Sequence, residues 1–141
     1  QWALLGLLHD IDFEEIGTDY KRHGIVGVEI LGDRIDDEIK KAIKSHNYEN
    51  TGFNPESKIE LALIAADAIS GLIIACALMM PSKKIADVTV ESIDKKFKKK
   101  EFARNCNREH ILYCERIGIE RIKFYEISLK SLQSIANELG L

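Results

Sequence analysis

The fold of this chain is decided by its longest apolar stretch, Ser57-Lys-Ile-Glu-Leu-Ala-Leu-Ile-Ala-Ala-Asp-Ala-Ile-Ser-Gly-Leu-Ile-Ile-Ala-Cys-Ala-Leu-Met-Met80. Apolar side chains occupy every side of a helix drawn over these residues, which is typical of a helix buried in a protein core. Ser57 and Glu60 have the spacing of a capping box at its start, and Pro81 stops it. We therefore expect a long, central, buried helix.

On both sides of this helix, apolar residues recur at intervals of three and four, and the chain has only two prolines. The first predicted helix ends near His9-Asp10. The other predicted helices span about 20–31, 36–46, 89–103, 107–117 and 122–139, and Gly140 ends the last of them. Residues 47–55 are rich in turn formers. The predicted fold class is all-α, a helical bundle in which residues 1–141 form a single domain.

Composition limits the partners and the compartment. The net charge of -3 argues against a generic nucleic-acid binder. The three cysteines show no CxxC spacing, which favours reduced thiols in a cytoplasmic protein. Asp67 and Ser70 interrupt the longest apolar stretch, so we expect no membrane span.

The first residues give a further expectation. The chain begins with Gln1, inside an apolar helix without an N-cap, and this run lacks the basic residues and cleavage site of a signal peptide. We therefore expect the sequence to be the C-terminal part of a longer protein, without its N-terminal helix or helices.

Five polar residues lie at the end of an apolar run or on an apolar face of a predicted helix. His9 and Asp10 form a pair at the end of the first apolar run. His46 shares a stripe with the isoleucines of its helix, His23 aligns with apolar residues that follow it, and Asp67 lies within the long apolar helix. Burying such groups is costly unless a cation or hydrogen-bond partners compensate, and imidazole and carboxylate are ligands of divalent cations. The pattern predicts a metal site.

Alternatives for these residues stay open at this point. Either inward histidine, His23 or His46, could be a core residue whose ring binds a backbone carbonyl. Asp67 could instead cap another helix or form a buried salt bridge. A metal ion explains Asp67, His9 and Asp10 together, which these alternatives do not.

The polar residues belong to an ordered set of short motifs: H-D, R-H-G-I-V-G-V-E-I-L, A-I-K-S-H-N, T-G and A-A-D. In this order they resemble the HD-domain superfamily of metal-dependent phosphohydrolases, over roughly residues 2–72. Segments 81–88 and 102–109 are similar to the C-terminal helices of small HD hydrolases. The resemblance implies an HD-domain-like bundle and a hydrolase.

The resemblance also implies roles for single residues. His9, Asp10 and Asp67 would hold one metal ion, and His23 and His46 would hold a second ion bridged by Asp10, which is therefore also the expected catalytic carboxylate. A further histidine ligand, upstream in the family, has no counterpart here. The expected cofactor is a divalent ion (Mn, Fe, Co, Ni, Mg or Zn), with one or two ions bound.

Two departures from the family leave the substrate open. Many relatives follow the pair with glycine or alanine and then lysine, where this chain has Asp12 and Phe13. The stretch Ala-Asp-Ala-Ile-Ser-Gly-Leu stands where the dinucleoside-tetraphosphatase branch has proline and arginine, which argues against a dinucleotide. We expect a nucleotide or another small phosphorylated metabolite, with monoesterase and diesterase activity both open.

Phosphoester hydrolysis also needs cations at the phosphoryl oxygens. Arg22 is the candidate that we assign to catalysis, with Lys83 and Lys84 as further candidates; solvated surface charge is the alternative for each. The basic run 95–100 is interpreted as a solvated helix face and His110 as a packing residue. A homodimer is left open. The rival functions are a non-catalytic HD module that binds metal or nucleotide as a sensor or scaffold, and a protein whose histidines are purely structural.

Overall fold

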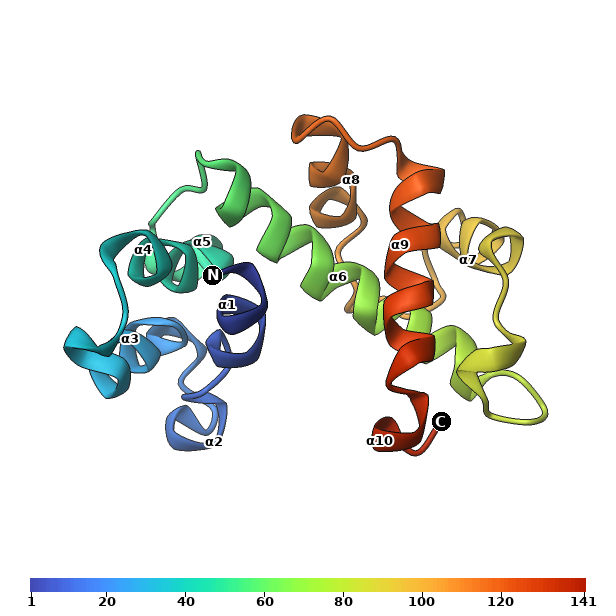
Figure 1. Cartoon of the computed structure of the whole chain (residues 1–141), viewed down its shortest axis with the longest axis horizontal. Coiled ribbons are helices and arrows are strands. Elements are labelled where there is room, and N and C mark those ends of the chain that lie inside the picture. The colour runs from blue at the N-terminus through green and yellow to red at the C-terminus, as the bar shows by residue number, and fades with distance from the viewer. The chain divides into compact units, whose positions relative to one another are not determined.

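The computed structural model describes all residues, 1–141, and every regular element in it is a helix (Figure 1). This confirms the predicted all-α fold class. The α-helices and the short 3₁₀ segments (η) are, in chain order, α1 (Trp2–Leu8), α2 (Phe13–Ile16), η1 (Tyr20–Arg22), α3 (Ile25–Leu31), η2 (Gly32–Arg34), α4 (Asp37–His46), α5 (Tyr48–Thr51), α6 (Lys58–Leu78), η3 (Ile85–Asp87), α7 (Val90–Phe97), α8 (Arg108–Arg116), α9 (Arg121–Ser134) and α10 (Ala136–Leu139).

The capping box predicted at the start of α6 is present. The Ser57 hydroxyl accepts a hydrogen bond from the Glu60 backbone N–H, and Glu60 Oε2 accepts the N–H groups of Glu56 (2.7 Å) and Ser57 (3.3 Å). These contacts satisfy N–H groups that the first turn of a helix leaves without intrahelical partners. The helix therefore begins where the sequence predicts.

The chain forms two compact units, residues 1–63 and residues 64–141, and the boundary falls inside α6. In the first unit α4 contacts α1, α3 and α5. Its core consists of Leu5, Leu31, Ile35, Ile39, Ala42, Ile43, Ile59 and Leu63.

In the second unit α9 contacts α7, α8 and η3. Its core includes Ile69, Leu72, Ile73, Ile93, Ile111, Phe124, Tyr125 and Leu129. Because α6 supplies core residues to each unit, it is the central helix predicted from the sequence; the single-domain assignment stays a prediction.

Three predicted helices are shorter or broken. The segment 20–31 divides at Gly24, whose φ of 85° is outside the helical region. The helix predicted to end near residue 103 stops at Phe97. The last helix divides at Ile135, where the backbone leaves helical geometry between α9 and α10.

The prediction that α6 is buried on all sides is wrong. Ala66, Asp67, Gly71 and Leu78 are exposed, and they lie on one stripe of the helix. Most of these side chains are small or charged, so leaving them in water forfeits little hydrophobic burial. By length and composition alone α6 could cross a membrane, a test that the core helix of a soluble protein also passes, and half of its most apolar window is buried inside the protein.

All three cysteines are free thiols, and each is kept from ionising by its surroundings. Burial raises the pKa of Cys76 and Cys106, and it raises that of Cys114 to about 11. Thiolates, the nucleophilic and metal-binding form of cysteine, are therefore scarce in this protein near neutral pH.

Candidate metal centre

Three chain segments of the first unit place polar side chains around Asp10. His9 and Asp10 follow directly on α1, His23 follows directly on η1, and His46 is the last residue of α4. The side chains of His9, His23 and His46 are only 16%, 12% and 5% exposed, respectively, whereas that of Asp10 is 49% exposed. The site is therefore covered on the histidine side and open at the carboxylate.

Asp10, His23 and His46 could hold a metal ion, because each offers one ligand atom and these atoms lie within 4.8 Å of one another. Asp10 Oδ1 is 3.2 Å from His23 Nε2 and 3.5 Å from His46 Nε2. The two imidazole Nε2 atoms are 2.9 Å apart. This group contains three of the five predicted ligands.

His9 lies at the edge of the same group. Its Nε2 is 3.2 Å from the other oxygen of Asp10, Oδ2. Its ring meets the His46 ring edge to face, with centroids 5.2 Å apart. Each of the three imidazoles thus directs its Nε2 atom toward the Asp10 carboxylate.

The other ring nitrogen of each histidine is held by an acceptor. His9 Nδ1 donates to the Gly6 carbonyl (2.8 Å), and His46 Nδ1 donates to the Ile43 carbonyl. His23 Nδ1 donates to Asp12 Oδ1 at 2.9 Å. In a neutral imidazole with Nδ1 protonated, Nε2 carries the lone pair. These contacts therefore select the tautomer that a metal ligand needs at Nε2.

The protonation of Asp10 and that of the surrounding histidines depend on each other. Burial by itself raises the pKa of Asp10, but the contacts with His23, His46 and His9 outweigh it, and the pKa lies well below its usual range. The hydrogen bond to Asp10 raises the pKa of His23 against the effect of burial, and the charge of Asp12 adds to the rise. The carboxylate is thus ionised, and a positive charge is favoured beside it.

The residues fit a divalent cation. Two imidazole lone pairs 2.9 Å apart repel each other unless a proton or a metal ion lies between them. Two or three imidazoles with one carboxylate are a common ligand set for first-row divalent ions. The open side at Asp10 would leave coordination positions for water or substrate.

The remaining predicted site residues are outside this group. Asp67 belongs to the second unit and is exposed, so the expectation of a buried, uncompensated carboxylate is wrong; its role as a ligand stays a prediction. Arg22 is 58% exposed and pairs with Glu29 at 3.6 Å. Lys83 and Lys84 are exposed residues of the second unit.

Sequence reasoning missed the role of Asp12, which it treated only as a departure from the family pattern. The residue is 0% exposed, and its carboxylate accepts hydrogen bonds from His23, Gly24 and Gly27. The signal available in the sequence was the glycine directly after His23. A Cβ at Gly24 would lie 2.6 Å from the Ile43 carbonyl oxygen, and the φ of 85° at this position favours glycine.

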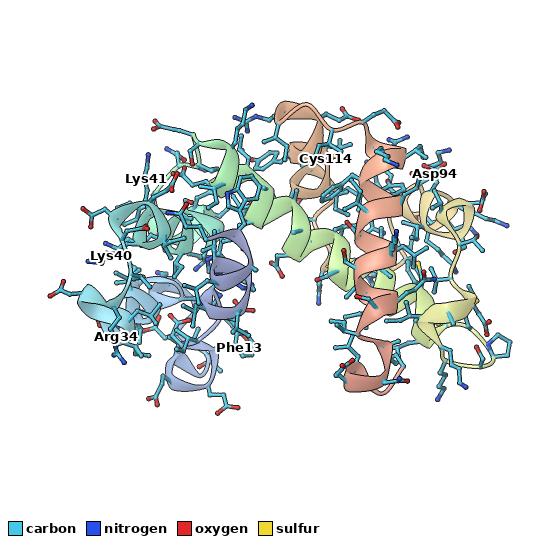
Figure 2. The ribbon with its side chains drawn as sticks, in the orientation of Figure 1. Phe13, Arg34, Lys40, Lys41, Asp94 and Cys114 are labelled. Atoms are coloured by element: carbon cyan, nitrogen blue, oxygen red, sulfur yellow. The ribbon has the colours of Figure 1, made fainter.

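His23 faces inward as predicted, but for a different reason. It is not on a helical stripe, because its backbone is extended (φ -60°, ψ 129°) between η1 and α3. Asn47 Nδ2 donates to the carbonyls of Tyr20 (2.7 Å) and His23 (3.1 Å) and fixes this turn. The Phe13 ring, labelled on α2 in Figure 2, meets the His23 ring edge to face at 6.0 Å.

Comparison with protein-family models, with curated proteins and with solved structures finds no match for this chain.

Proposed function

We propose that the protein is a metal-dependent phosphohydrolase that acts on a nucleotide or another small phosphoester. The observation that supports this most is the set of imidazole Nε2 atoms directed at the half-exposed Asp10 carboxylate. His23, His46 and Asp10 would hold one ion, and His9 lies within reach of the same carboxylate. The resemblance to the HD-domain superfamily supplies the reaction class.

The chemistry follows from this ligand set. These residues would hold a divalent ion, which would supply activation of a water and neutralisation of charge on the phosphoryl oxygens. The histidine rings exclude solvent from one side, and the exposed edge at Asp10 is where a phosphate can approach. Arg22, which precedes His23 and is solvent-exposed, is the proposed cation for the non-bridging oxygens.

The first experiment measures metal binding and turnover together. Apo-protein is titrated with Mn²⁺, Fe²⁺, Co²⁺, Ni²⁺, Mg²⁺ and Zn²⁺, and each loaded form is assayed against mono-, di- and cyclic nucleotides. We expect a bound divalent ion and hydrolysis that depends on it. His46→Gln should lower metal affinity at least about tenfold, since it removes one ligand. His110→Gln, which changes a histidine outside the site, should leave the affinity unchanged.

A non-catalytic role is the second candidate, and the departure at positions 12 and 13 favours it, because the lysine common in relatives is absent there. The protein would then bind metal or a nucleotide as a sensor or scaffold. Tight metal binding without turnover on any nucleotide would decide for this alternative. Absence of both metal binding and nucleotide binding would contradict both candidates and leave the histidines with a structural role.

The role of Asp67 is tested with the same titration. Asp67→Asn keeps the size of the side chain and removes its charge. If Asp67 is a ligand, as the family resemblance implies, the number of bound ions or their affinity will fall. Asp37→Asn, a change at a fully exposed aspartate, is the matched control.

A further inference from the structure

Asp12 is the most completely buried carboxylate near the metal centre. It immediately precedes α2, and its side chain is 0% exposed. One oxygen, Oδ2, accepts the backbone N–H groups of Gly24 and Gly27, each at 2.8 Å. The other oxygen, Oδ1, accepts from His23 Nδ1 at 2.9 Å. A buried carboxylate is costly unless it is hydrogen-bonded in this way.

The two backbone donors fix the carboxylate in one orientation. Gly24 and Gly27 begin α3, so Oδ2 binds N–H groups at the start of that helix, where they lack intrahelical partners. A Cβ at Gly27 would lie 3.4 Å from the carboxylate, in ordinary contact with it, so the Gly27 backbone lies directly against Asp12. With Oδ2 held, Oδ1 can only face His23.

The acceptor at Nδ1 distinguishes His23 from the other two histidines. His9 and His46 donate through Nδ1 to backbone carbonyls, which are neutral acceptors. His23 alone donates to a carboxylate. A carboxylate behind a metal-bound imidazole fixes its tautomer and orientation and increases its basicity as a ligand.

We propose that Asp12 is the positioning residue of the metal centre: it holds the imidazole proton of His23 on Nδ1, so that the Nε2 lone pair faces Asp10 and His46. This inference rests on the proposed metal binding of the site. Asp12 touches no reacting atom and acts through His23.

The first test uses the unmodified protein and needs no metal. Two-dimensional ¹H–¹⁵N spectra of the imidazoles, followed to a pH at which the His23 signals no longer change and the ring is neutral, report which ring nitrogen keeps its proton. We expect His23 to be protonated at Nδ1, the form that is less populated in free histidine. A His23→Gln spectrum assigns the signal. Protonation at Nε2 in the native protein would overturn the proposal.

The second test replaces the carboxylate by an amide of the same shape. In Asp12→Asn the amide oxygen keeps the N–H groups of Gly24 and Gly27, so the amide NH₂ faces His23 and favours a proton on Nε2. We expect Co²⁺ and Zn²⁺ affinity to fall about 10- to 100-fold, with a changed Co²⁺ absorption spectrum. Asp33→Asn, at a fully exposed aspartate, is the control.

The outcomes separate this proposal from the proposed function. Circular dichroism confirms that Asp12→Asn is folded before its affinity is compared. Native affinity in folded Asp12→Asn would overturn the positioning role even if the enzyme is active. If the native protein binds no metal, the proposed function fails, while the imidazole spectra still decide which tautomer Asp12 selects. Loss of turnover without loss of affinity or change of tautomer would also contradict the proposal.

Discussion

His23 has a carboxylate at each ring nitrogen, Asp12 at Nδ1 and Asp10 at Nε2. Both negative charges favour the imidazolium form of His23. Without a metal ion, a proton on Nε2 can bind Asp10 and His46 at once, and this proton occupies the place of the proposed cation. Protons and metal ions therefore compete for one position.

This competition predicts the pH dependence of metal binding. The pKa of His23 is raised above its ordinary value of 6.5, mainly by the hydrogen bond to Asp10, so the imidazolium persists to higher pH than in a free histidine. Metal binding must displace this proton, and affinity should fall as pH decreases through the raised pKa. Calorimetry at about pH 7 in two buffers of different ionisation enthalpy should show proton release. Binding without proton release would contradict this assignment.

At the scale of residues, the sequence predicts part of the site. The inward position of His46 follows from its place on an apolar stripe, and that of His9 follows from the apolar run that it ends, whereas Asp10 beside it is 49% exposed. Asp12 could not be found this way, since its burial depends on backbone N–H groups of a helix twelve to fifteen residues further on. Asp67 was misplaced because small neighbours such as Ala66 allow an exposed stripe on an apolar helix.

The start of α6 gives a prediction at the scale of elements. The Glu60 side chain is 2% exposed and accepts two backbone N–H groups. Its Oε1 lies 3.6 Å from Nζ of Lys41, which is labelled on α4 in Figure 2. Glu60→Ala should lower the free energy of unfolding by about 1–3 kcal/mol, because buried donors lose their acceptor. Glu56→Ala, at an exposed residue that also pairs with Lys41, should cost less than about 1 kcal/mol. Urea denaturation measures both; equal losses would contradict the prediction.

The same residue has a pH signature. Burial by itself raises the pKa of Glu60, but hydrogen bonds from Glu56 and Ser57 outweigh it, and the net pKa is lowered from 4.5. A carboxylate with a lowered pKa contributes stability above its unfolded-state pKa and loses it as pH falls through the folded one. The difference in stability between native protein and Glu60→Ala should therefore shrink below about pH 4.5.

The end of α7 gives a second prediction. Arg108 donates to the carbonyls of Ala103 and Cys106, each at 2.8 Å. Its guanidinium also binds the carbonyls of Lys96, Phe97, Lys99 and Phe102. Arg108→Lys should lower the free energy of unfolding by about 2 kcal/mol, since an ammonium has three donors and cannot reach all these acceptors. Thermal unfolding compares it with Arg104→Lys, at an exposed arginine; a neutral Arg108→Lys would contradict the prediction.

The predicted start of a helix agrees with the structure where a capping residue precedes it in the sequence. Asp36 and Asn107 cap α4 and α8 through their side chains, and both helices begin as expected. Helix interruptions were missed where distant residues cause them. The break at Gly24 accompanies its contacts with Asp12 and Ile43, and the turns after Phe97 are held by Arg108.

At the scale of the molecule, the ligands of the candidate centre all belong to residues 1–63. A metal ion that binds only the folded state stabilises it by about 2.7 kcal/mol at a concentration a hundred times its dissociation constant. We expect Zn²⁺ to slow amide hydrogen exchange in peptides covering α1, α3 and α4, measured by mass spectrometry. His46→Gln should abolish this protection. Uniform protection that persists in His46→Gln would place the bound ion elsewhere.

The donor set of the centre has a consequence for the living cell. It offers nitrogen and oxygen, and burial keeps the three thiols of the chain protonated and out of the competition. Such donors do not by themselves exclude any first-row divalent ion, and intrinsic affinity favours copper and zinc over manganese. Occupancy would then follow the supply of each metal during growth. Protein from manganese-rich and from zinc-rich cultures would carry different ions on the same side chains, those of Asp10, His23 and His46.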